Sequence, residues 1–234
     1  MKQSKAAARN SERRNVLLAL AYNIIENEGF YSINIHHLSD ATDIAVPTIY
    51  RLFSCKEEIL AAIAINGLTK LKAMLLLASE YKGNTRERIV AVHLTQNSFA
   101  AQYGVDYQAY YTMKSDGVAQ KISQASHLEA DRLIADCLNI IEGIILEAII
   151  AQDLVLPEEL TPHEFAYHIW ALHFGHNVLT RFNYNSEITI RGKVISQRLF
   201  FRKMLDNFKW KPYSTEFDYV VAGRRIVRKL KLFH

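Results

Sequence analysis

The residues best suited to bind a charged partner stand close together in the stretch "VPTIYRLFSCK", positions 46–56. The hydroxyl groups of Thr48 and Tyr50 can donate hydrogen bonds to phosphate oxygens. Lys56 adds a positive charge where a helix is expected to begin, and the unpaired N–H groups of a helix start also favour phosphate. Contacts of this kind would hold a phosphate backbone in place without reading its sequence.

Two apolar residues of the same stretch suit a different surface. Val46 and Pro47 cannot make a bidentate hydrogen bond, but both can pack on the methyl group of a thymine. We therefore expect modest direct readout with T-rich contacts, supported by duplex shape and by a basic N-terminal arm in the minor groove. His36, at the start of a preceding short helix, could add a phosphate contact.

A second group of polar and aromatic residues lies in the middle of the chain. Tyr103, Tyr107 and Tyr110 are four and three residues apart, which places them on one stripe of a helix. His93 and Asn97 stand one helical turn apart on the segment before them. These tyrosines are either ordinary core residues or the wall of a small-molecule pocket, with an aromatic compound as its ligand. The pocket prediction comprises seven residues: His93, Asn97, Tyr103, Tyr107, Tyr110, Glu142 and His176.

Catalytic and metal-binding patterns are absent from the sequence. No nucleophile–base pair and no carboxylate dyad stands at a useful spacing, so we expect neither enzymatic activity nor a cofactor. Four histidines invite a metal hypothesis: His163, His168, His173 and His176. Only the last two share a helical face, and no Cys or carboxylate stands at a suitable offset from both, so no metal site is predicted.

Length and composition bound the class of protein. The chain has 234 residues, half of them apolar, which suits one large or two small globular domains of roughly 100–200 residues each. Cys55 and Cys137 form no CxxC pair and no apolar signal region opens the sequence, so we expect a cytoplasmic protein with reduced thiols. The apolar run "IIEGIILEAIIAQ" contains two glutamates and is shorter than the ~20 residues that span a bilayer, so we expect no membrane partner.

The net charge of +4 is unevenly distributed along the chain. Residues 1–14 carry five basic side chains and one acidic one, whereas residues 61–189 carry nine basic and fourteen acidic ones. Residues 190–234 carry twelve basic and three acidic side chains. The basic N-terminus suits nucleic acid, although a charged run is more often a solvated face. The C-terminal segment, 216–234, fits either an amphipathic helix or a short extended segment, and its charge suits DNA, an acidic partner or solvent alone.

Helical periodicity runs through nearly the whole sequence, so the predicted fold class is all-α. We expect helices over about 13–28, 35–41 and 45–52, followed by a long helix from Lys56 to about Leu77. Two short helices joined by a three-residue turn, after a longer helix, outline a helix-turn-helix unit.

Local signals support these helix ends. Gly29 stands where a left-handed C-terminal cap is expected, and Asn34 is placed to cap the second helix at its N-terminus. Pro47 is tolerated in the first turn of the third helix.

The segment "GFYSINIHHLSDATDIAVPTIYRLFSCKEEIL", residues 29–60, resembles the N-terminal DNA-binding domain of the TetR family of bacterial transcriptional regulators. The resemblance implies a three-helix DNA-binding domain over residues 1–60 and a larger helical domain for effector binding and dimerisation over residues 61–234. Beyond about residue 65 only length and helicity agree. The similarity depends on residues at fixed spacing: Gly29, Phe30, Asn34, Ile35, Leu38, Ile44, Thr48, Ile49, Tyr50, Phe53, Lys56 and Leu60.

Three positions depart from the family pattern. Asp43 occupies the turn position usually filled by Gly, and Asp tolerates a positive φ better than most residues. Ala45 replaces the usual Ser at the start of the recognition helix, which removes an N-cap worth on the order of 1 kcal/mol. Pro47 replaces a small or flexible residue. These departures affect the expected sequence preference more than the fold.

The recognition helix is expected to have an inner and an outer face. Ile44, Ile49, Leu52 and Phe53 would pack on the preceding helices, which turns the remaining residues outward. The predicted DNA contacts are Asn34, His36, Val46, Pro47, Thr48, Tyr50, Arg51 and Lys56.

The segment "HEFAYHIWALHFGHNVLTRF", residues 163–182, is apolar on two sides when it is drawn as a helix. Such a helix must be buried on two sides, and a second copy of the chain is the simplest second partner. One face holds Phe165, Ile169, Leu172, His176 and Leu179. The resemblance also implies dimerisation through the last major helices, with the helix near 194–208 as a neighbour. The predicted dimer face is Tyr167, Ala171, Phe174, Val178 and Phe182.

These observations lead to two hypotheses. The first is a homodimeric, ligand-responsive transcriptional regulator, most simply a repressor, whose two recognition helices lie about 34–36 Å apart on a palindromic operator. The long helix that begins at Lys56 would connect the two domains, with Gly67 permitting a bend or serving close packing. The alternative is a helical protein–protein adaptor whose DNA-binding unit has decayed, as Asp43 and Ala45 could indicate.

Overall fold

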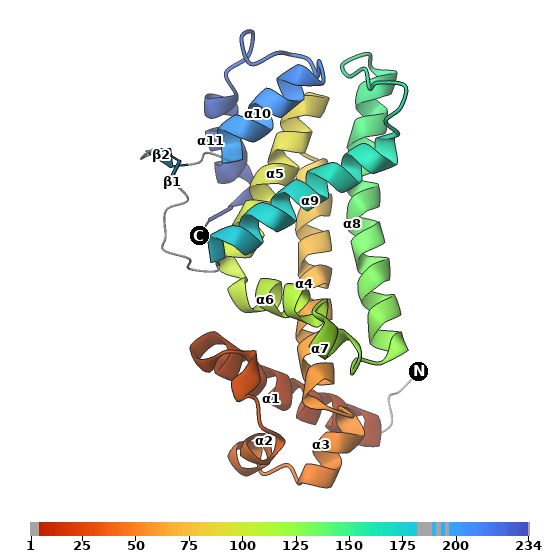
Figure 1. Ribbon diagram of the computed structural model, residues 1–234, viewed down its shortest axis with the longest axis vertical. Coiled ribbons are helices and arrows are strands. Elements are labelled where there is room, and N and C mark those ends of the chain that lie inside the picture. Colours follow the sequence, from red (N-terminus) through yellow and green to blue (C-terminus); the bar gives the residue numbers. More distant parts are fainter. Residues whose placement is uncertain (1–4, 182–188, 191–192, 195–196, 234) are drawn as a thin grey trace. The chain divides into compact units, whose positions relative to one another are not determined.

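The computed structural model describes residues 5–181, 189–190, 193–194 and 197–233 (Figure 1). It confirms the all-α fold class, with one short antiparallel pair of strands in which Thr189 faces Val194. In chain order the elements are α1 (Lys5–Glu28), the 3-10 helix η1 (Phe30–Ser32), α2 (Ile35–Thr42), α3 (Val46–Leu52), α4 (Lys56–Ser79), α5 (Thr85–Gln102), α6 (Gly104–Met113), α7 (Asp116–Ala119), α8 (Gln124–Ile150), α9 (Pro162–Arg181), β1 (Thr189–Ile190), β2 (Lys193–Val194), α10 (Gln197–Asn207) and α11 (Tyr219–Leu230).

The chain divides into two compact units. The first comprises the residues up to Lys70 together with Tyr103–Leu133, and the second comprises Leu71–Gln102 and the residues from Ile134 onward. Helices α4 and α8 each contribute residues to both units. The first unit therefore contains all of the predicted DNA-binding domain, residues 1–60, and adds the start of α4, helices α6 and α7, and the start of α8.

The first unit is built around the apolar face of α1. Leu17, Ala21, Ile24 and Ile25 of this helix are buried, and α1 packs against η1, α2 and α6. Helix α1 begins eight residues earlier than predicted, because the run Ala6–Ala8 consists of the strongest helix former. The basic arm predicted at the N-terminus is helical over residues 5–14, where its basic side chains lie on α1, and its contact with a minor groove stays a prediction.

Helix α4 is long and apolar enough, by length and composition alone, to cross a membrane. However, 56% of its most apolar stretch is buried inside the protein. This burial is typical of the core helix of a folded domain, and one such helix is weak support for a membrane span.

The second unit has α5 at its centre. Helix α5 packs against both α9 and α11, and most of its side chains are buried, among them the charged residues Arg86 and Glu87. The C-terminal segment, for which the sequence left two possibilities open, forms helix α11. Asp218 caps this helix, since its side chain accepts hydrogen bonds from the backbone N–H groups of Val220 and Val221 at 2.9 and 3.0 Å.

Candidate nucleic-acid interface and ligand pocket

The turn between α2 and α3 is shaped by local chemistry that the sequence predicts. The Asn34 side chain accepts a hydrogen bond from the backbone N–H of His36 at 2.9 Å and so caps α2. Asp43 ends α2 in the left-handed region, with φ 54° and ψ 23°, as expected of a residue that replaces Gly. Ala45 makes no side-chain cap for α3. Gly29 has the positive φ expected after α1, but its ψ of 166° lies outside the left-handed helical region.

Helix α3 has the inner and outer faces predicted for a recognition helix. Ile49 and Phe53 are buried, at 0% and 2% exposure, and hold α3 against its own unit. On the other side Tyr50 is half exposed, and Pro47 and Arg51 are exposed. The remaining two outward-facing residues, Val46 and Thr48, are partly exposed. The outer face is therefore open to a partner along the length of the helix.

Two basic residues flank α3 but are partly engaged within the unit. Arg14 donates a hydrogen bond to the carbonyl oxygen of Leu52 at 3.2 Å, and its guanidinium lies 4.2 Å from the ring centre of Phe53. Lys56 Nζ lies 3.5 Å from the carbonyl oxygens of Tyr31 and Ile33. The Arg14 contact holds the C-terminal end of α3, and the Lys56 contacts join the start of α4 to the segment after α1. Among the predicted phosphate ligands, His36 is exposed beside the N-terminus of α2.

The predicted ligand residues fall in both units. Tyr103, Tyr107 and Tyr110 belong to the first unit, where Tyr107 and Tyr110 are buried on α6. Glu142 belongs to the second unit, where its carboxylate accepts a hydrogen bond from His163 Nδ1 at 2.8 Å. The remaining three predicted residues also belong to the second unit: His93, Asn97 and His176.

The first unit also contains a buried carboxylate that the sequence analysis did not single out. Asp106 of α6 is 2% exposed, accepts a hydrogen bond from the Tyr22 hydroxyl at 3.2 Å, and pairs with Lys70 Nζ at 2.8 Å. Burial is the main cause that raises the pKa of Tyr22 to about 12, and the negative charge of Asp106 is the second cause. Asp106 thus ties α6 to α1 and α4.

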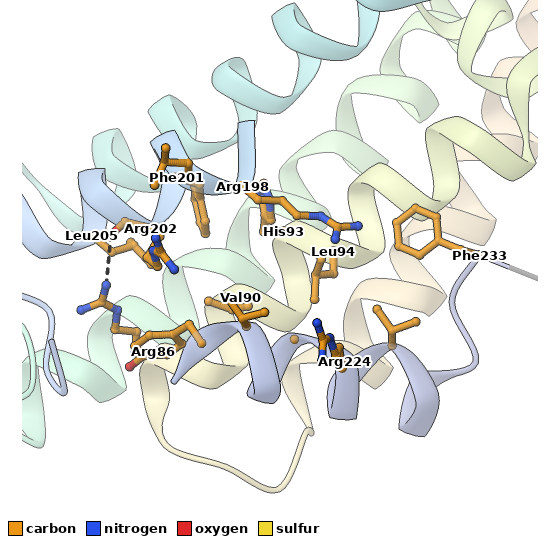
Figure 2. Close-up of a pocket in the computed structure, with 15 residues that line it drawn as sticks. Arg86, Val90, His93, Leu94, Arg198, Phe201, Arg202, Leu205, Arg224 and Phe233 are labelled. Atoms are coloured by element: carbon orange, nitrogen blue, oxygen red, sulfur yellow. Dashed lines mark hydrogen bonds between the residues drawn. The ribbon is translucent and has the colours of Figure 1, made fainter. Parts of the chain in front are cut away.

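A pocket of about 690 Å³ opens in the second unit between α5, α10, α11 and Phe233 (Figure 2). Of the predicted ligand residues, His93 alone is among those that line it. Four arginines that the sequence analysis did not select line it as well: Arg86, Arg198, Arg202 and Arg224. The sequence feature that could have indicated Arg198, Arg202 and Arg224 is the excess of basic residues after position 190. The sequence alone could not distinguish this excess from a solvated face.

A chain of hydrogen bonds links His93 to the interior behind the pocket. His173 Nδ1 lies 2.6 Å from the carbonyl oxygen of Ile169 and therefore donates to it, which leaves His173 Nε2 to accept from His93 Nδ1 at 2.5 Å. The amide nitrogen of Asn97 lies 3.4 Å from His93 Nε2, which therefore accepts a hydrogen bond from it. Phe201 stacks on the His93 ring with centroids 4.3 Å apart. This order of donors requires both rings to be neutral.

The electrostatics of the pair agree with this assignment. Burial lowers the pKa of His173 to about 4. Burial is the main cause that holds the pKa of His93 well below its ordinary value of 6.5, and the neighbouring His173 and Arg198 lower it further. Within the described residues no group of three or more His, Cys, Asp or Glu side chains is placed to hold a metal ion.

Within a single chain, helix α9 has one buried face, which is rotated from the inner face expected from its sequence. Phe165 and Ile169 are buried as predicted, but Leu179 of the same predicted face is 63% exposed. The buried side turns instead toward Ala166, Trp170 and His173. Along the predicted dimer face Tyr167 is 55% exposed and three residues are partly exposed, namely Ala171, Phe174 and Val178. Phe182 lies outside the described residues.

Comparison with known proteins places this fold. No family model and no curated protein sequence matches the chain. Among solved structures, a tetR-family regulatory protein from Rhodococcus RHA1 is 14% identical, with a TM-score of 0.58 over 98% of this chain and 97% of that one. A TetR/AcrR-family transcriptional regulator from Thermobifida fusca is 15% identical, with a TM-score of 0.61 over 86% and 98%. A gamma-butyrolactone receptor (ArpA-like protein) is 14% identical, with a TM-score of 0.61 over 94% and 99%.

Fold and site together define an all-α protein with an N-terminal helix-turn-helix unit. The chain has the fold of the TetR-family regulators across nearly its whole length, as its sequence resemblance predicted.

Proposed function

We propose that the protein is a DNA-binding transcriptional regulator whose helix α3 enters the major groove. The observation that carries this proposal is the division of α3 into two faces. Ile49 is fully buried and fixes the helix, whereas Pro47, Tyr50 and Arg51 point away from the unit. A rigid helix with a free polar face at a helix-turn-helix corner suits groove binding.

The contacts of this helix would mainly position the protein on the duplex. The Tyr50 and Thr48 hydroxyls suit phosphate oxygens, and Val46 and Pro47 suit thymine methyl groups. Asn34 and His36 lie at the N-terminus of α2, whose free N–H groups also favour phosphate. Base readout by apolar contact alone is modest, so we expect the operator to be recognised partly through its shape and deformability.

We further propose a cytoplasmic homodimer that acts as a repressor on a palindromic operator and is released by a small effector. The α9 stripe, formed by the exposed Tyr167 and the partly exposed Ala171, Phe174 and Val178, supports the dimer, since an apolar helix face of this kind is normally covered by another element. Two copies related by a twofold axis would offer two recognition helices to two half-sites. Enzymatic activity is not expected of this arrangement.

Selection of genomic DNA fragments on the purified full-length protein tests the proposal. Recovery of a palindrome with half-sites one helical turn apart is the expected result. Recovery of no preferred sequence would contradict the proposal and favour the protein–protein adaptor.

The salt dependence of binding to the selected fragment tests the phosphate contacts. With about four cationic contacts per dimer, log K should fall with log salt concentration at a slope of roughly −4. A nearly flat plot would contradict several phosphate contacts.

A further inference from the structure

The pocket between α5, α10 and α11 is lined with charge of one sign. Its described lining contains four arginines and no aspartate or glutamate. Arg86 comes from α5, Arg198 and Arg202 from α10, and Arg224 from α11. In Figure 2 Arg198 projects from the α10 side and Arg224 from the α11 side, with Leu94 of α5 between them. Arginine side chains therefore line the pocket from three different helices.

Within the described part of the chain, Arg86 alone of these arginines has an acidic partner. Arg86 pairs with Asp206 at 2.7 Å. Among the described residues, no ion pair or carboxylate hydrogen bond engages Arg198, Arg202 or Arg224, and the Nε atom of Arg202 is buried without a hydrogen-bond partner. Arg198 lies with its guanidinium carbon 5.8 Å from the ring centre of Phe233. Arg198 and Arg224 are exposed and Arg202 is partly exposed, so an anion that enters the pocket meets positive charge with no acidic side chain in the described lining.

The remaining wall of the pocket is largely apolar. Val90 and Leu94 of α5, Leu205 and Phe201 of α10, and Val227 of α11 contribute aliphatic and aromatic surface. The pocket volume of about 690 Å³ falls within the range of roughly 300–1,000 Å³ found for small-molecule sites. A ligand that fits both features has an apolar body and an anionic head.

We propose that this pocket binds a small amphiphilic anion, with a carboxylate or phosphate head held by Arg198 and Arg224 and a hydrocarbon body against α5 and α10. Arginine binds planar carboxylates and phosphates through paired hydrogen bonds, which suits either head group. The site differs from the tyrosine-lined pocket predicted from the sequence. Its role as the effector site rests on the proposed function, whereas binding itself does not.

Titration of the delipidated full-length protein tests the ligand class. Dodecanoate and dodecyl phosphate are compared with dodecanol and dodecyltrimethylammonium, all below their micellar concentrations, by isothermal titration calorimetry. We expect one anion per chain to bind, and the neutral and cationic compounds to bind about tenfold more weakly or not at all. Comparison of the two anions distinguishes a carboxylate from a phosphate ligand. Equal binding of all four compounds would overturn the proposal.

Paired variants test the arginines. Arg198→Met together with Arg224→Met should weaken binding of the preferred anion by about tenfold or more and leave binding of dodecanol unchanged. Arg228→Met removes an exposed arginine from α11 that does not line the pocket, and it should bind the anion like the unaltered protein. Near-ultraviolet circular dichroism confirms that each variant is folded. Equal anion binding by the double variant and the Arg228 control would overturn the proposal.

Two further measurements separate this inference from its alternatives. Sedimentation of the double variant shows whether the pocket is an interface between copies of the chain. The proposal is overturned if the double variant no longer forms a dimer and the unaltered protein binds no anion. DNA binding is measured independently. If the protein binds the anion but no operator, the pocket assignment is supported and the proposed function is contradicted. If it binds an operator but no anion, the proposed function is supported and the pocket assignment is contradicted.

Discussion

Arg86 is a buried arginine whose partners come from the far end of the chain. Its side chain is fully buried, its guanidinium pairs with Asp206, and it donates to the carbonyl oxygens of Arg202 and Pro212 at 3.0 and 2.9 Å. It also donates to the Ser214 hydroxyl at 3.1 Å. Burial acts to raise the pKa of Asp206, but hydrogen bonds from Ser214 and Arg86 lower it below its ordinary value. One side chain thus organises the segment between α10 and α11.

Replacement of this arginine should therefore be severe. We expect Arg86→Met to lower the free energy of unfolding by about 3–5 kcal/mol, because Asp206 and the carbonyl oxygens of Arg202 and Pro212 would lose the buried guanidinium that joins them. Urea denaturation measures the change. The control is Arg132→Met, which removes an exposed ion pair with Glu129 and should cost less than about 1 kcal/mol. Equal effects of the two substitutions would contradict the role assigned to Arg86.

The His93–His173 pair predicts a dependence of stability on pH. The unfolded chain takes up protons near the ordinary pKa of 6.5, whereas folded His173 does so only near its pKa of about 4. Between these values the unfolded state binds more protons, so stability is fully present above pH 6.5 and falls as the pH decreases toward 4. For His173 we expect a loss of about 1–2 kcal/mol between pH 6.5 and pH 5, measured by urea denaturation, and His93 should add to this loss in the same direction.

Substitution at the pair provides the control for this pH dependence. His173→Gln should reduce the difference in stability between pH 6.5 and pH 5, whereas His168→Gln, at an exposed position of the same helix, should leave it unchanged. An unaltered pH dependence in the His173 variant would show that other groups cause it.

Single residues were predictable from the sequence where their chemistry is local. The Asn34 cap and the left-handed Asp43 depend on neighbours within a few positions, and both were predicted correctly. Arg86 was not singled out, because its partners are 116 to 128 residues away along the chain. The neutral histidine pair was missed for the same reason, since His93 and His173 are 80 residues apart.

At the scale of elements, Gly67 explains how closely α4 and α6 approach. A Cβ atom at this position would lie 2.5 Å from the Cβ of Asp106, which is closer than real side chains allow. The contact involves the root of a buried side chain, not its flexible end, so the neighbour cannot simply turn away. Of the two roles considered for Gly67 in the sequence, close packing is the one that the structure supports.

We expect Gly67→Ala to lower the free energy of unfolding by about 1–3 kcal/mol, because the added methyl group must displace α6. Gly143→Ala is the matched control, since a Cβ there meets nothing within 4 Å in helix α8. That substitution should instead stabilise the protein by about 0.5–1 kcal/mol, as Ala favours a helix more than Gly. Thermal unfolding of both variants measures the opposite signs, and stabilisation by both would contradict the close-packing role.

Helices themselves were well predicted because periodicity and caps are sequence-local signals. Helices α2, α3 and α4 begin within one residue of their expected starts. Helix α1 was predicted too short, because its start was placed at about Arg13 although the alanines at positions 6–8 favour a helix. The form of α11 was left open, because its burial against α5 is a tertiary contact that periodicity alone does not contain.

The whole molecule combines a recognisable helix-turn-helix with a pocket that the sequence did not locate. The helix-turn-helix residues form one continuous segment, so their spacing could be compared with a known pattern. The arginine-lined pocket joins α5 to two helices more than 90 residues further along the chain, and Val90, Arg198 and Arg224 all line it. No rule of residue spacing connects segments so far apart. The ligand prediction was based on the tyrosine stripe because its residues lie close together in the sequence.

The dimer proposed for DNA binding makes the last prediction. Ala171 lies at the centre of the α9 stripe and is partly exposed, so Ala171→Glu would place a charge in the middle of an apolar interface without disturbing the buried face of the helix. We expect this variant to sediment as a monomer and to bind a palindromic operator about a hundredfold or more weakly, because each chain alone contacts one half-site. His168→Glu adds the same charge at an exposed position off the stripe and should remain dimeric. A dimeric Ala171 variant with full operator affinity would show that the copies meet through another surface.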